Sequence, residues 1–138
     1  MATILFASSC EETISEKEGN WDPIELDKTH VKFPHEGGQN TVSALNYSRW
    51  WICGGYDILR IADLRLESDY IRATSSGGEE TYTYDVLDGG WYHLLVPDKG
   101  KSNTVIITVD PNVDSGPREA IIQMTVGDAF TTFSISQP

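Results

Sequence analysis

Aromatic residues are the side chains of this sequence whose type and spacing could bind a ligand. They occur as three pairs, which are Trp50 with Trp51, Trp91 with Tyr92, and Tyr82 with Tyr84. A flat ring can offer its face to the C–H side of a pyranose and exclude water, so each pair is a candidate sugar platform. Adjacent strand residues point to opposite faces, whereas residues two apart share one face. We expect Trp50 and Tyr92 to be the outward members of their pairs.

The same rings could instead form the core of a β-sandwich. In that interpretation one tryptophan of each pair is a buried anchor, and the tyrosine pair packs across strands. Both interpretations remain open on the sequence, and alanine substitutions separate them. Replacing Trp50 or Tyr92 would weaken glycan binding with little loss of stability if the ring is a platform. It would lower the stability strongly if the ring lies in the core.

Oxygen-bearing side chains recur at every second position in Asp110, Asn112 and Asp114. Calcium loops use this spacing to place alternate oxygen atoms around a hard cation. The rest of the calcium pattern is absent, because Gly116 falls one place late and Ile121 stands where a bidentate glutamate is required. We therefore expect an inter-strand turn in which Asp and Asn bond their own backbone, with no metal and no cofactor.

The sequence lacks the patterns that catalysis uses. His30, His35 and His93 are scattered, and His35 has no second histidine at the spacing of a zinc helix. Neither a Gly-x-Ser-x-Gly turn nor a phosphate-binding loop occurs. Glu79 and Glu80 are neighbours on opposite faces of a strand, so they do not form a carboxylate pair across a cleft. We expect the protein not to be an enzyme.

Length and charge restrict the class of protein further. The chain has 138 residues, enough for one domain with a substantial core. It carries 21 acidic and 10 basic residues, a formal net charge of −11. A surface of this sign repels polyanions, so we expect no nucleic-acid partner. It is typical of a solvated extracellular surface or of a surface that binds cations.

The C-terminal half predicts antiparallel β-structure. β-Branched and aromatic residues gather in four runs that turn residues separate. The runs are Trp91–Val96, Asn103–Val109, Glu119–Val126 and Phe130–Ser136. Gly127 and Asp128 predict a tight hairpin between the last two, because glycine reaches positive φ without steric cost. Alternation in the last run points Phe133 and Ile135 inward.

The N-terminal half predicts shorter strands around one irregular region. The expected strands are Ile24–Asp27, Thr29–Phe33, Asn40–Leu45, one beginning at Arg49–Ile52, and Glu80–Val86. The sequence GGYD at residues 54–57 predicts a break. Leu59–Arg72 is expected to be an inserted β-hairpin.

The first 22 residues predict the cellular address. Ala7-Ser8-Ser9-Cys10 resembles the end of a bacterial lipoprotein signal, where cleavage leaves the cysteine as the lipidated first residue. We expect residues 1–22 to be a signal remnant and tether, with membrane attachment only through a lipid on Cys10. A frayed terminal segment is the alternative. If Cys10 is lipidated, Cys53 is left alone and is expected to be a small buried apolar residue, whereas retention of an unmodified Cys10 would allow a Cys10–Cys53 bridge.

Two stretches resemble the BACON domain, an immunoglobulin-like β-sandwich of Bacteroidetes surface proteins. In the first, FPHEGGQNTVSALNYSRWWI, a Gly-Gly turn leads into a strand, a polar corner and a tryptophan. In the second, from Trp91 to Gln137, the order W…P..G…N.T…N…R.A…Q matches the family pattern. Together they cover roughly residues 30–137. This resemblance implies a sandwich of seven to eight strands.

The resemblance also assigns two further features. The family's tryptophan-bearing strands are close in sequence, whereas about 40 residues separate Trp51 from Trp91, so residues 53–80 are expected to be an insertion. Arg118 stands where the family usually has arginine. We expect it to be structural and to bind loop carbonyls or a carboxylate such as Asp114.

The expectation is therefore an all-β, immunoglobulin-like antiparallel β-sandwich over residues 23–138, with an inserted hairpin at about 53–80. The family resemblance implies a lipid-anchored protein of the outer membrane or cell surface that binds carbohydrate, a glycan or mucin, through exposed aromatic residues. The alternative is a structural spacer or a protein-interaction and adhesion domain whose insertion contacts a surface protein. An apolar patch or an open edge strand on the insertion would favour the alternative.

Overall fold

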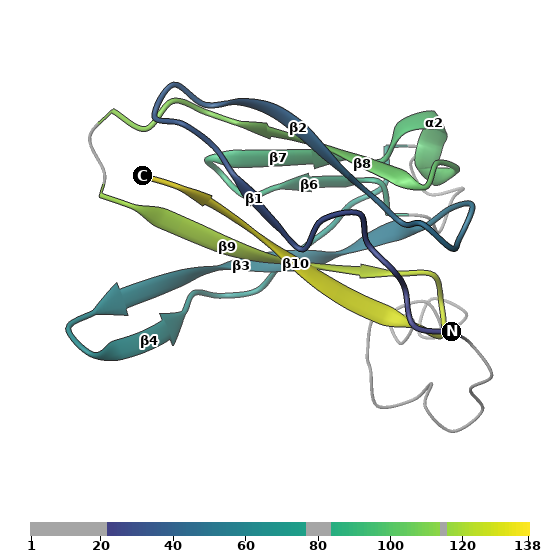
Figure 1. Ribbon diagram of the computed structural model, residues 1–138, viewed down its shortest axis with the longest axis horizontal. Helices are drawn as coiled ribbons and strands as arrows, with labels where there is room; N and C mark the ends of the chain where they lie inside the picture. The colour runs from purple at the N-terminus through teal and green to yellow at the C-terminus, as the bar shows by residue number, and fades with distance from the viewer. Residues whose placement is uncertain (1–21, 77–83, 114–115) are drawn as a thin grey trace.

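Two β-sheets packed face to face form the part of the chain that the computed structural model describes, residues 22–76, 84–113 and 116–138 (Figure 1). The larger sheet consists of β1 (His30–Lys32), β3 (Trp51–Ile61), β4 (Leu64–Glu67), β5 (Ile71–Arg72), β9 (Arg118–Thr125) and β10 (Phe130–Gln137). The smaller consists of β2 (Gly38–Ser43), β6 (Val86–Asp88), β7 (Tyr92–Leu95) and β8 (Thr104–Val109). Their strand orders are β1-β10-β9-β3-β4, with β5 also paired to β3, and β2-β8-β7-β6.

The predicted fold class, an all-β sandwich, is confirmed. Of the ten strands in the described part of the chain, β4 and β5 belong to the insertion, which leaves the eight that a seven-to-eight-stranded sandwich requires. The four predicted C-terminal runs are β7 to β10, each shifted by at most one residue at either end. Between β7 and β8 lies the turn labelled α2 (Pro97–Gly100), in which Asp98 and Lys99 have positive φ values, so it is not a regular helix.

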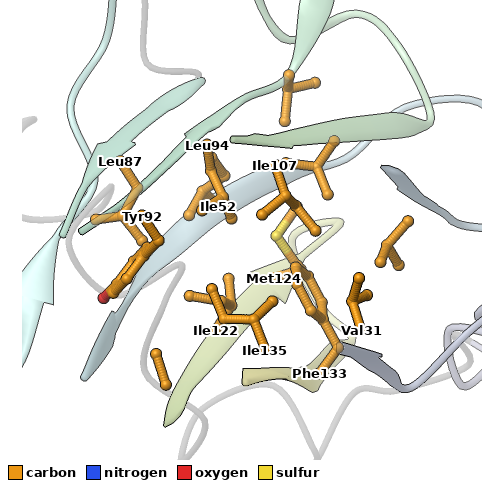
Figure 2. Packing of buried hydrophobic residues seen from close by; sticks show 14 of the residues in the cluster. Val31, Ile52, Leu87, Tyr92, Leu94, Ile107, Ile122, Met124, Phe133 and Ile135 are labelled. Atoms are coloured by element: carbon orange, nitrogen blue, oxygen red, sulfur yellow. The ribbon is translucent and has the colours of Figure 1, made fainter. Parts of the chain in front are cut away.

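The core lies between the sheets and is built by alternation along each strand. In β8 every second residue is buried, as a half-exposed strand of period two requires. Phe133 and Ile135 of β10 point inward as predicted, and they pack beside Ile122 and Met124 of β9 (Figure 2). Complete burial of one such side chain stabilises the fold by about 1.5–3 kcal/mol.

The break predicted at GGYD is wrong, because β3 continues through it for 11 residues. Gly54 is needed for close packing rather than for a turn. A Cβ there would lie 2.8 Å from the ring of Tyr70, and one at Gly55 would lie 2.8 Å from the Ile121 carbonyl oxygen. A register shift between Ile52 and Gly54 marks a bulge in the strand. The two glycines thus let neighbouring chain segments approach β3.

The hairpin predicted within Leu59–Arg72 is confirmed. Residues 51–58 of β3 pair with β9 in the main sheet, and from Leu59 onward the chain projects with β4 as an arm beyond the sandwich (Figure 1). A two-residue turn, Ala62-Asp63, joins the strands, and Ala62 has a φ of 57°. The chain then returns through β5, which pairs with Gly54 and Gly55.

Several predictions concern residues near or beyond the described ranges. Residues 80–83 of the strand predicted at Glu80–Val86 lie outside them, and β6 begins only at Val86. The predicted tether and Cys10 also lie outside the described residues. Within those residues, no helix has the length and apolar character to cross a membrane.

Candidate functional site

The expectation that Trp50 and Tyr92 face outward is wrong. Both side chains are fully buried in the core. The cause is the strand register, since Tyr92 of β7 lies opposite the buried Val109 of β8. Paired residues share a face, so Tyr92 must point inward. Trp50 precedes β3 and is buried together with Ile52, while Trp51 between them turns to the other side. Neither Trp50 nor Tyr92 can present its ring to a ligand in this structure.

Tyr92 shows how fully the core encloses these rings. Gly89 lies directly against the Tyr92 ring, where a Cβ would overlap it. Burial raises the pKa of the Tyr92 phenol above its usual value, and the nearby Asp57 and Asp88 raise it further. The Tyr92 hydroxyl and the Trp50 indole nitrogen have no hydrogen-bond partner in the described structure. These two residues are core anchors.

Trp51, Tyr84 and Trp91 are half-buried, and Tyr82 lies outside the described residues. The ring of Trp51 lies on the outer face of the larger sheet near Gly127, 3.9 Å from where a Cβ of that glycine would stand. Tyr84 packs against the core, and its carbonyl accepts a hydrogen bond of 2.9 Å from the Ile52 amide. The structure therefore does not bring the described members of the predicted aromatic set together as one platform.

Trp91 is held in place on several sides. Its indole Nε1 donates to Asp57 Oδ2 at 3.1 Å, and the Tyr92 ring meets it edge-on with centroids 5.1 Å apart. The Arg118 guanidinium lies over the Trp91 ring, 4.7 Å from its centroid, in cation–π geometry. Because Arg118 covers the ring, Trp91 is not an open sugar platform.

The structural role predicted for Arg118 is confirmed. Its Nη2 donates to the carbonyl oxygens of Asp110 at 3.2 Å and Pro111 at 3.4 Å, and its Nε donates to Gln137 Oε1 at 2.8 Å. The buried Asn112 also ties this loop to the chain end, since its Nδ2 donates to the Pro138 carbonyl at 2.9 Å. The Asn112 side chain of the loop before β9 thus forms hydrogen bonds to backbone carbonyl groups. Within the described ranges, no group of three acidic, histidine or cysteine residues could hold a metal.

A cavity of about 660 Å³ lies on the larger sheet, where β1, β10, β9 and β3 come side by side. Four of its lining residues form one row across these strands, Lys32–Ser136–Glu119–Ile58, because each is paired with the next. The other lining residues are Phe33, Arg60, Pro117, Arg118, Gln137 and Pro138. The lining therefore combines apolar residues with charged and polar ones.

The lining of the cavity includes positively and negatively charged side chains. Arg60 Nη2 donates to Glu119 Oε1 at 3.2 Å, and both side chains are partly exposed. No ion pair within the described residues involves Lys32. Sequence reasoning missed this cavity because its residues are up to about 100 positions apart. The available signal was alternation, which places Lys32, Glu119 and Ser136 on the outer faces of their strands.

Cys53 lies in β3, almost fully buried, and is disulfide-bonded. Its bonding partner lies outside the described residues. The interpretation of Cys53 as a solitary buried thiol is therefore wrong.

The comparisons with known proteins agree with this architecture. Residues 72–138, from β5 to the C-terminus, match the family model described as "BACON: Putative binding domain, N-terminal". A solved NMR structure of a protein from Bacteroides thetaiotaomicron is similar in fold, with a TM-score of 0.59 and 24% identity over 90% of this chain and 93% of that chain. No curated protein is similar in sequence. Residues 72–138 are thus similar to a family of putative binding domains, and the similarity covers the part of the chain from β5 onward.

Proposed function

We propose that this chain is a non-enzymatic module that binds carbohydrate in the cavity on the outer face of its larger sheet. The observation that carries the proposal is the cavity itself, which is lined by apolar residues and by groups that donate and accept hydrogen bonds. Its volume of about 660 Å³ lies within the range of small-molecule sites. The match to a family of binding domains supports a ligand of some kind.

The lining suits a sugar because a pyranose combines apolar C–H faces with hydroxyls. The exposed prolines Pro117 and Pro138 supply apolar surface for the ring, while Phe33 and Ile58, also in the lining, are almost fully buried. In the lining, the Lys32 ammonium donates and the Glu119 carboxylate accepts, while the Ser136 hydroxyl already lies 3.0 Å from His30 Nε2. Arg60 orients the Glu119 carboxylate through their 3.2 Å contact. A hydroxyl-rich ligand finds both kinds of partner there.

Trp91 has a different role in this proposal from the one predicted. It is a reporter of the cavity, because Arg118 both stacks on Trp91 and lines the cavity. A ligand that displaces the guanidinium changes the surroundings of the indole. Binding should then shift tryptophan fluorescence, and Trp91→Phe should abolish the shift without abolishing binding.

The test is a panel of mucin and plant glycans titrated into the full chain, first by fluorescence and then by calorimetry. Glu119→Gln should weaken binding at least tenfold, because it removes the charged acceptor and frees Arg60. Its melting temperature should change little, since an exposed ion pair contributes about 0–1 kcal/mol. Asp128→Asn is the matched control, an exposed acid at the other end of β9. Equal affinities of Glu119→Gln and wild type would exclude the cavity as the sugar site.

We also propose that the chain works outside the cytoplasm. The disulfide at Cys53 supports this, because structural disulfides persist in oxidising compartments. The lipid anchor predicted at Cys10 stays a prediction. A thioether at Cys10 and an intrachain disulfide exclude each other, because the sequence has only two cysteines. The chain is therefore either exported with its disulfide intact or anchored through a lipid on Cys10, and the two forms can be distinguished by experiment.

A second candidate function, protein interaction, rests on the arm. The insertion exposes four large aliphatic side chains on β3 and β4, and β4 is an edge strand of the described sheet. These are the two features that favour a protein partner.

A further inference from the structure

One face of the β3–β4 arm is an exposed aliphatic patch. Leu59 is 45% exposed, Ile61 59%, Leu64 61% and Leu66 43%. Leu59 is paired with Leu66, and Ile61 with Leu64, so all four side chains share one face of the hairpin. A cluster of this kind on a projecting arm marks an interaction surface rather than ordinary surface scatter.

The outer edge of β4 is also unpaired within the described structure, since the sheet order ends there. Antiparallel pairs alternate between bonded and non-bonded positions. The Ser68 amide donates to the Asp57 carbonyl at 3.0 Å, which makes Asp57–Ser68 a bonded position. By alternation, Leu66 is bonded to β3, and the backbone groups of Arg65 and Glu67 point away from it. Those groups are open to another strand.

We propose that β4 pairs antiparallel with β4 of a second copy of this chain, with Leu66 on the twofold axis. In this register Arg65 of each copy lies opposite Glu67 of the other, on the face opposite the leucines. The two positions exchange four backbone hydrogen bonds and form two ion pairs. The two Leu66 side chains meet at the axis on the aliphatic face. The proposal goes beyond the sugar site, which it does not require.

Charge complementarity selects this register from the alternatives. Centring the pair on Arg65 would place arginine opposite arginine, and centring it on Glu67 would place glutamate opposite glutamate, both of which are destabilising. If the twofold axis lay between two residues of β4, the free N–H and C=O groups of one copy would face residues whose own N–H and C=O groups already bond to β3. Within each chain Arg65 Nη1 lies 3.1 Å from Glu67 Oε2, and this exposed pair is free to exchange for contacts across the axis.

The test is sedimentation velocity of the full chain, from about 1 μM to about 1 mM, a range that covers weak specific interfaces. The mass should rise with concentration from that of the monomer, 15.3 kDa, toward twice that value. Arg65→Glu and Glu67→Arg should each weaken association at least tenfold, because each opposes like charges at the axis. The double variant Arg65→Glu/Glu67→Arg should restore it. Lys101→Glu, an exposed charge reversal after α2, should leave it unchanged.

Three results would overturn the proposal. The first is a wild type that stays monomeric over the whole range. The second is a dimer that both single reversals leave intact, which would place the contact elsewhere. The third is a double variant that remains monomeric while its circular dichroism matches wild type. None of these results depends on glycan, so they are separable from a failure of the sugar site.

Discussion

Removing the hydroxyl of Tyr92 tests whether this ring is a core anchor or a ligand platform. The side chain is fully buried, and its oxygen has no hydrogen-bond partner in the described structure. A buried polar group without a partner costs about 1–3 kcal/mol in lost solvation. Tyr92→Phe keeps the ring and removes that cost, so we expect the free energy of unfolding to rise by about 1–2 kcal/mol.

The same substitution has a pH-dependent effect. Burial, with Asp57 and Asp88 nearby, raises the pKa of Tyr92 in the folded state. The unfolded chain loses this proton above about pH 10, while the folded chain keeps it. The stability that depends on the protonated phenol is therefore fully present below about pH 10 and falls by about 1.4 kcal/mol per pH unit above it. Tyr92→Phe escapes this loss, so its advantage over wild type grows as the pH rises.

Urea unfolding followed by far-ultraviolet circular dichroism at pH 8 and near pH 11 measures both effects. Tyr92→Ala should lose about 3–5 kcal/mol, as expected for a large core ring. Tyr56→Phe, on the outer face of β3 and half-buried, is the matched control and should change little. A Phe variant less stable than wild type by more than about 1 kcal/mol at pH 8 would show that the hydroxyl is bonded. An alanine variant as stable as wild type would refute the core assignment.

Two further predictions concern β3. Gly54→Ala should lower the free energy of unfolding by about 2 kcal/mol or more, because its Cβ would collide with Tyr70 and Ile71. The control, Gly116→Ala, places its Cβ in open space and should leave the free energy of unfolding in urea nearly unchanged. Protein recovered from its native membrane or medium should show no free thiol at Cys53 if the bridge forms. Intact-mass spectrometry should then show a rise of two hydrogen masses on reduction, and a lipid-sized addition with a free Cys53 thiol would establish the anchored form instead.

Period-two alternation made the C-terminal half predictable, because each strand of a half-buried sheet must place its apolar residues on one face. That is why Phe133 and Ile135 were assigned correctly. The adjacent aromatic pairs were assigned wrongly. Alternation predicts that neighbouring residues face opposite sides of the sheet, but it does not predict which of the two faces inward. The answer depends on strand pairing, such as Tyr92 opposite Val109, which joins residues that no local pattern connects.

The two other misses have a similar origin. Glycines at 54 and 55 have the same local signature whether the chain turns or another segment packs against it. Only the return of β5 and the Tyr70 ring decides for packing. The cavity likewise depends on register, because its row joins Lys32 to Ile58 through two strands near the C-terminus. Alternation along the sequence predicted the face of the strand on which each residue lies. It did not predict which strands pair with one another.

The cavity and the arm are connected through β3, and their geometry gives them a joint consequence. Arg60 lines the cavity from the polar face of the arm, and its neighbours Leu59 and Ile61 lie on the aliphatic face. A twofold axis through Leu66 is perpendicular to the sheet, so edge pairing keeps the same face up in both copies. The two cavities of such a dimer open on one side of a continuous sheet. A glycan-bearing surface can then occupy both cavities of the dimer. Binding in the second cavity is intramolecular once the first is occupied, and this raises the avidity of a site that lacks an exposed aromatic platform.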